Sequence, residues 1–416
     1  MPKKKHLLRK EVTYSDIKDE ELNILHQLGY HAEQSRFFAH LLDRRGWMQT
    51  VVAHHLNVSP AACHVAGIEE WLHGSFNVCV PIAIDTWNGK RVLLRFPLPY
   101  RVGEAMLSNT WKEGHHNTKL RTNLLRDLGR IFLSLCRVPL PSIGSFIIDK
   151  NGFLRLANRP LSVEIELLEN EDIPTDIPRE YTYSTVDSYV IDVLGAHDNR
   201  FRYQPNAVNN LGDCAYQLSV LTAMRTIFQS IFTRSCRRGP FVFMFTDLHQ
   251  SNIFVDSDWH ITCLVDLEWA CTRPIEMVMP PYWFTDKGVD ELVAAEYDVI
   301  RRQFMELLAA EEKELGCAAL MKSNDRSALL RLSDVMNRTW ETGAFWYALA
   351  LSSPSGLFTI FSNHIKPLFC KDYNEEFGVV MPFFFEKDVG GIAGRKLADK
   401  KEYDRNLRDA FEDCSD

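Results

Sequence analysis

The stretch that most constrains the fold of this chain spans residues 241–270, FVFMFTDLHQSNIFVDSDWHITCLVDLEWA. Its apolar runs FVFMF, IFV and ITCLV are typical of short strands, and the polar segment DSDWH predicts a hairpin turn between the last two. Carboxylate and amide side chains interrupt these runs. A buried sheet excludes such groups unless they have hydrogen-bond partners, a metal ion or chemistry to perform.

The predicted hairpin gathers four of these polar side chains. It brings Asp247 and Asn252, which precede its first strand, close to Asp266 and Glu268, which follow its second. Oxygen donors grouped in this way suit phosphoryl transfer, in which magnesium is held against nucleotide phosphates beside an attacking hydroxyl. In the kinase-type arrangement an Asp receives the hydroxyl proton, an Asn five residues later binds magnesium, and an Asp after a hairpin binds it too.

These offsets assign a role to each residue. We expect Asp247 to be the catalytic base, Asn252 and Asp266 to ligate magnesium, and Glu268 to ligate or support the metal. A structural alternative is that Asp247 and Asn252 cap the hairpin and that Asp266 caps a helix beginning near Glu268. The joint spacing around the hairpin favours the catalytic interpretation.

Composition narrows the classes of function. The chain has 416 residues, of which 46% are hydrophobic, enough for a packed core and for two or three ordinary domains or one large bilobal domain. The net charge of -8 gives no general reason to bind nucleic acid and suits a cationic small molecule slightly better. The ten cysteines form no C-x-x-C pair, which argues against a disulfide framework or a zinc ribbon. We expect a cytoplasmic protein with no secretion signal, no membrane span and no nucleic-acid partner.

Hydrophobic periodicity divides the rest of the chain. It predicts helices over residues 15–58, broken at Gly29 and Gly46, and a small antiparallel sheet over residues 66–96. A further helix is expected to begin near Leu120 and to end before Pro139. The elements expected after it are a hairpin in SFIIDKNGFLRLA, a loop over 164–180, helices over 186–197 and 214–235, and a mainly helical region over 290–361.

The segment TDLHQSNIFVDSDWHITCLVDLEWA also resembles the catalytic and metal loops of aminoglycoside phosphotransferase-like proteins, whose fungal members are related to choline kinases and protein kinases. Further similarity lies in GSFNVCVPI, VLLRFPLPYRVGEA, MLSNTW, VPLPSIGSFIID, YVIDVL and RPIEMVMPPYWF, so the resemblance covers most of residues 65–300. One departure is that these relatives commonly have His two residues before the catalytic Asp, where this chain has Phe245.

The resemblance implies a nucleotide site as well as a catalytic loop. Residues 74–77, which are Gly74, Ser75, Phe76 and Asn77, would form the loop over the phosphates of ATP. Arg95 would take the place of the strand lysine that contacts phosphate, a role that suits its permanent charge. His249, inside the catalytic loop, would orient that loop by hydrogen bonding. The implied cofactors are ATP and Mg²⁺.

The resemblance breaks after Arg95. A kinase-like small lobe continues there with a helix, two strands and a hinge that holds adenine, which together need roughly 35 residues. Only 24 residues, 96–119, separate Arg95 from Leu120 at the start of the next predicted helix. RVGEA is joined directly to MLSNTW, as though those elements were missing. A gene-model artefact, a splice form and a real loss are all open explanations.

The fold that the resemblance implies is α+β, a protein-kinase-like bilobal fold with a truncated small β lobe and a mainly helical large lobe. The expected function is transfer of the ATP γ-phosphate to a hydroxyl of a small molecule, and aminoglycosides, choline-like molecules and sugars are all open as the acceptor. The alternative is a catalytically inactive kinase-like binding or scaffold protein. The expected domains are a helical extension (1–65), the truncated small lobe (66–105), the helical lobe with both loops (106–380) and a charged tail (381–416).

Overall fold

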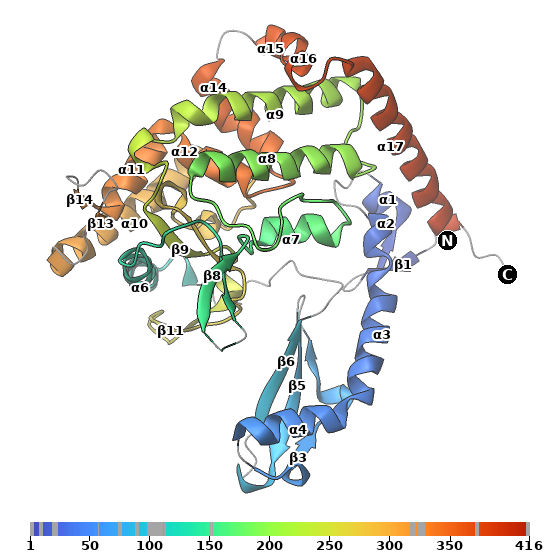
Figure 1. The fold of residues 1–416 in the computed structure, drawn as a ribbon, viewed down its shortest axis with the longest axis vertical. Helices are drawn as coiled ribbons and strands as arrows, with labels where there is room; N and C mark the ends of the chain where they lie inside the picture. Colours follow the sequence, from blue (N-terminus) through green and yellow to red (C-terminus); the bar gives the residue numbers. More distant parts are fainter. Residues whose placement is uncertain are drawn as a thin grey trace. The chain divides into compact units, whose positions relative to one another are not determined.

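The chain is a mixed α+β protein, as expected from the sequence (Figure 1). Its contacts separate two compact units, Met1–Ala105 with Lys401–Asp416 and Met106–Lys400, each with a core of its own. The kinase-like bilobal arrangement stays a prediction. Within the described ranges, no helix is both long and apolar enough to cross a membrane. A computed structural model describes residues 4–7, 11–18, 24–56, 58–73, 77–87, 91–97, 111, 114–149, 151, 153–316, 321–322, 329–370 and 374–412.

The first unit is built on an antiparallel sheet in which β5 pairs with β3, β4 and β6. Alternate residues of β5 face the core, because Val78, Val80 and Ile82 are fully buried. This confirms the sheet predicted over residues 66–96 and adds β3 to it. The elements are β1 (Lys4–His6), β2 (Glu11–Thr13), α1 (Tyr14–Ile17), α2 (Ile24–Gln27), α3 (Tyr30–Asp43), α4 (Arg45–Leu56), β3 (Cys63–Val65), β4 (Leu72–His73), β5 (Asn77–Ile84) and β6 (Arg91–Pro97).

Two features of this unit differ from the sequence expectation. The helix does not break at Gly46, which lies inside α4; the interruption falls at Arg44. The segment expected as a charged tail is mostly the helix α17 (Val389–Glu412). Its residues Tyr403, Leu407 and Phe411 recur every four positions and are buried in a core of the first unit, because they share one helical face.

The second unit is mainly helical, and α8 and α9 run side by side in it (Figure 1). The predicted helix near Leu120 is confirmed as α6, whose N-cap Asn117 accepts hydrogen bonds from the backbone of Lys119 at 3.0 Å and Leu120 at 3.3 Å. The helices are α6 (Thr118–Cys136), α7 (Val163–Asn170), α8 (Val186–Tyr203), α9 (Leu211–Ile231), α10 (Ala294–Leu315), α11 (Leu332–Thr342), α12 (Ala344–Leu351), α13 (Leu357–Ile360), α14 (Lys366–Phe369), α15 (Asn374–Val380) and α16 (Pro382–Phe385).

Short antiparallel strand pairs lie among these helices. The predicted strands β9, β10 and β11 are confirmed, but β9 pairs with a strand that was not predicted, β12, in a register that sets Phe245 opposite Ala270. The pairs are β7 (Ser145–Ile148) with β8 (Leu154–Asn158), β9 (Phe241–Phe245) with β12 (Ala270–Pro274), β10 (Ile253–Val255) with β11 (Ile261–Leu264), and β13 (Met321–Lys322) with β14 (Leu329–Leu330).

One further prediction for this unit was wrong, and one structural alternative is excluded. The loop expected over residues 164–180 begins with the helix α7, because Glu164 and Glu166 favour its first turn and Ile165 and Leu168 are buried. No helix begins near Glu268, since the chain leads there into β12. Asp266 is therefore not a helix cap, and that structural alternative for it is excluded.

Candidate active site

Backbone hydrogen bonds fix two polar loops side by side, 247–252 after β9 and 265–269 before β12. Thr246 donates from its backbone nitrogen and its Oγ1 to the carbonyl of Trp269, each at 2.8 Å. At the other end of the loops, the nitrogen of Val265 donates to the carbonyl of Asn252 at 3.0 Å. The four side chains expected at the site are carried by these two loops: Asp247, Asn252, Asp266 and Glu268.

The side chain of Asn252 is buried and is bonded to Asp247. Its Nδ2 donates to the Asp247 carbonyl at 2.8 Å and reaches the carboxylate oxygen Oδ2 at 3.4 Å. The bond to the Asp247 carbonyl is a contact expected if Asp247 and Asn252 only cap the hairpin. The same orientation leaves Oδ1, which accepts from Ser251 Oγ at 3.2 Å, as the amide atom able to ligate a cation.

The carboxyl group of Asp247 is less acidic than an ordinary Asp. Burial raises its pKa to about 6; the hydrogen bond from Asn252 lowers the pKa, and the charges of Asp266 and Glu268 raise it. The charges of Asp266 and Glu268 therefore act on the carboxyl group of Asp247. A carboxylate with a pKa near neutrality takes up a proton more readily than an ordinary Asp and is still ionised at pH 7.

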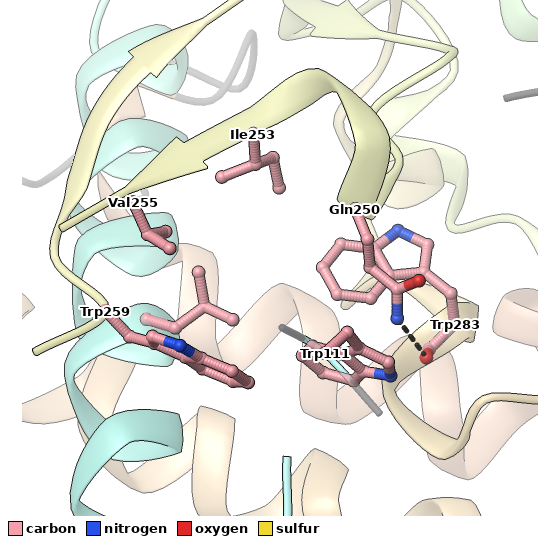
Figure 2. A pocket seen from close by; sticks show the side chains of 7 residues that line it. Trp111, Gln250, Ile253, Val255, Trp259 and Trp283 are labelled. Atoms are coloured by element: carbon pink, nitrogen blue, oxygen red, sulfur yellow. Dashed lines mark hydrogen bonds between the residues drawn. The ribbon is translucent and has the colours of Figure 1, made fainter. Parts of the chain in front are cut away.

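The loop carrying Asp247 rests on a tryptophan that the sequence analysis did not single out. Trp283 Nε1 donates to the Leu248 carbonyl at 2.7 Å, and Gln250 Nε2 donates back to the Trp283 carbonyl at 3.3 Å. Figure 2 shows this second bond beside Trp111 and Trp259, which stack at 5.6 Å between ring centroids. The three tryptophan rings line a cavity of about 30 Å³, room for about one water.

The orienting role expected of His249 stays a prediction. Within the described part of the chain its buried Nδ1 has no hydrogen-bond partner, and the ring instead meets Trp283 edge-on at 6.1 Å between centroids. Burial lowers the pKa of His249, with the charge of Asp286 acting in the opposite direction. In this geometry the ring of His249 packs against Trp283.

The oxygen donors of the site suit magnesium. Asp266 has a left-handed backbone (φ 57°), a conformation that is uncommon outside glycine and that recurs at functional sites. Among the residues that the structure describes, no group of three or more His, Cys, Asp and Glu side chains could hold a metal alone. Magnesium needs only one or two protein carboxylates, with phosphate and water completing its shell. The Asp266 carboxylate and the Asn252 amide oxygen fit that requirement by donor type.

The residues expected to bind the nucleotide belong to the first unit. Gly74, Ser75 and Phe76 lie outside the described residues. Asn77 is the first residue of β5, and Arg95 lies on β6 opposite Cys79. The structure thus brings together the four residues expected on the two loops, and it describes Asn77 and Arg95 within a separate unit.

A cavity of about 310 Å³ adjoins the loop of Asp247. Thr246, Asp247 and Leu248 line it together with mainly apolar side chains of β9, α6, α7 and residues 277–283. Among the described residues on its wall, the charged ones are Asp247, Glu164 and Arg273. The volume is at the lower end of the range for small-molecule sites.

Comparison with known proteins assigns no family to this fold and site. No protein-family model, no curated protein and no solved structure matches the chain significantly.

Proposed function

We propose that the chain is an aminoglycoside phosphotransferase-like kinase that transfers the γ-phosphate of ATP to a hydroxyl of a small molecule. The environment of Asp247 is the observation that best supports this proposal. Its carboxylate has a pKa of about 6, lies at the wall of a ligand-sized cavity and interacts with the charges of Asp266 and Glu268. A general base needs both a suitable pKa and room for its substrate.

Each residue has a defined part in this reaction. Asp247 accepts the acceptor's hydroxyl proton as the hydroxyl oxygen bonds to the γ-phosphorus; the bond to the bridging oxygen breaks, and its electron pair leaves with ADP. Asn252 holds Asp247 in place through its Nδ2 and, with Asp266, presents the oxygens that would hold magnesium. Bound magnesium would neutralise phosphate charge and lower the pKa of Asp247. Trp283 keeps the loop in position.

Thermal unfolding with and without ATP and magnesium tests the proposal before the acceptor is known. A ligand present at about a hundred times its dissociation constant adds roughly 2.7 kcal/mol of stability. We expect a magnesium-dependent rise in melting temperature that Asp266→Ala abolishes. Asp258→Ala, which changes an exposed acid that pairs with Lys119 at the far turn of the same hairpin, is the matched control and should keep the rise.

Turnover then tests the base. With any acceptor that is phosphorylated, Asp247→Asn should lower kcat by about 10²- to 10⁴-fold, the usual contribution of a general base. Full turnover by this variant would exclude Asp247 from proton transfer.

A second candidate function is a non-catalytic binding or scaffold protein. The 20 residues between the end of β6 at Pro97 and the start of α6 at Thr118 favour it, because a helix, two strands and a hinge need roughly 35. In that case the chain would unfold cooperatively, with no change in melting temperature on addition of ATP and magnesium.

A further inference from the structure

Most of the side chains that line the cavity beside Asp247 are apolar. Strand β9 runs along its wall, and Phe243, Met244 and Phe245 line it together with side chains such as Phe132 and Met279. Aromatic and methionine side chains bind apolar surface and adapt to irregular shapes. A ligand that fills this part of the cavity must itself be largely apolar.

The cavity has polar groups in two separate places. One is the loop of Thr246 and Asp247, next to which Tyr282 also lines the cavity. The other is Arg273 on β12, which donates to Ser352 Oγ at 3.0 Å; the hydroxyl residues Ser353 and Ser355, which follow Ser352, line the cavity too. The strand register sets Arg273 opposite Val242. From Val242 to Phe245 the strand advances roughly 10 Å, before the chain reaches Asp247. The two polar groups are therefore separated along the length of the cavity.

The polar group at Arg273 carries no net charge, because Glu164 pairs with it. Arg273 forms a salt bridge with Glu164 of α7, and their side chains are only 6% and 5% exposed. Such a pair offers hydrogen bonds to a neutral group but does not attract an isolated ion. An aminoglycoside carries several ammonium groups, each of which would need a carboxylate, and this wall offers only Asp247 beyond the neutralised pair within the described residues.

We infer that the cavity takes the acceptor and that the acceptor is an elongated, uncharged, mainly apolar molecule. It carries the reacting hydroxyl at one end and a neutral hydrogen-bonding group at the other. The role of this ligand as the phosphate acceptor rests on the proposed function. Its chemical class follows from the residues that line the cavity. An uncharged, mainly apolar ligand is neither an aminoglycoside nor one of the choline-like and sugar acceptors that the sequence left open.

Binding of linear diols without nucleotide tests the ligand class separately from catalysis. We expect 1,8-octanediol to bind by isothermal calorimetry at least about 50-fold more tightly than 1,4-butanediol, since each added methylene contributes up to about fourfold. Kanamycin, choline and glucose should show no binding at the concentration that saturates with octanediol. Tighter binding of any of these three, or equal affinity for the two diols, would overturn the inference.

Matched surface variants locate the binding site. Leu167, on α7, lines the cavity and is 38% exposed, whereas Ile191, on α8, is 41% exposed and does not line it. We expect Leu167→Gln to weaken octanediol binding about fivefold or more and Ile191→Gln to leave it unchanged. Equal effects of the two variants would place the diol elsewhere and overturn the inference.

Addition of ATP and magnesium to the same samples separates the two proposals. Phosphorylated octanediol supports both. Octanediol binding that depends on Leu167 but yields no phosphorylated product supports the ligand class and contradicts the proposed kinase activity. Phosphorylation of kanamycin, choline or glucose in preference to the diol supports the kinase and contradicts the ligand class.

Discussion

Two carboxylates on the wall of one cavity have opposite environments. Glu164 is paired with Arg273; burial lowers the pKa of Arg273, but Glu164, Tyr189 and Cys271 together raise it by more, so the net pKa is raised. Asp247 instead accepts from the neutral amide of Asn252 and lies near two further acids, and its pKa rises to about 6. The salt bridge of Glu164 with Arg273 joins α7 to β12 and cancels its charge. Among the described residues Asp247 has no such cation, and its raised pKa favours uptake of a proton.

The largest effect is expected from breaking the neutralised pair. Glu164→Gln leaves the charge of Arg273 buried without its partner and should lower the free energy of unfolding by about 3–5 kcal/mol. Denaturant unfolding measures this. The double variant Glu164→Leu with Arg273→Met removes both charges and should recover most of the loss. A loss below about 1 kcal/mol in the single variant would mean that the pair contributes no more than a surface salt bridge.

A smaller loss of stability is expected from changing Trp283, which contacts the loop of Asp247. Trp283→Phe removes the hydrogen bond to Leu248 and leaves space beneath the loop, which should cost about 2 kcal/mol of unfolding free energy and also lower kcat. Trp346→Phe is the control, because that buried indole stacks on His364 away from the loop. It should lose stability with kcat unchanged. Equal kcat in both variants would contradict a positioning role for Trp283.

The smallest effect, with the opposite sign, is expected at Asp247. Its folded-state pKa of about 6 lies above the ordinary value of 3.8, so ionisation of the carboxylate destabilises the folded state as pH rises between these values. At pH 8, Asp247→Asn should raise the free energy of unfolding by about 1–2 kcal/mol. The gain should vanish below about pH 4. A pH-independent difference between the two proteins would contradict the raised pKa.

The parts of the site that the sequence predicted are those with local signals. Strands β9, β10 and β11 are short apolar runs bounded by turn residues, and such patterns are legible over a few positions. Strand β12, with the sequence ACTRP, has no such pattern and is a strand because it pairs with β9. The contact of Trp283 with Leu248 was not predicted for a similar reason, since it joins residues 35 positions apart and leaves no local pattern.

The sequence by itself determined the strands around the hairpin and the set of side chains on its two loops, Asp247, Asn252, Asp266 and Glu268, because periodicity and turn chemistry act locally. Tertiary structure decided the raised pKa of Asp247, the cavity and the pairing of Glu164 with Arg273, which lie 109 positions apart. Burial and the charges around a group depend on segments that meet only when the chain has folded, so no local pattern carries them.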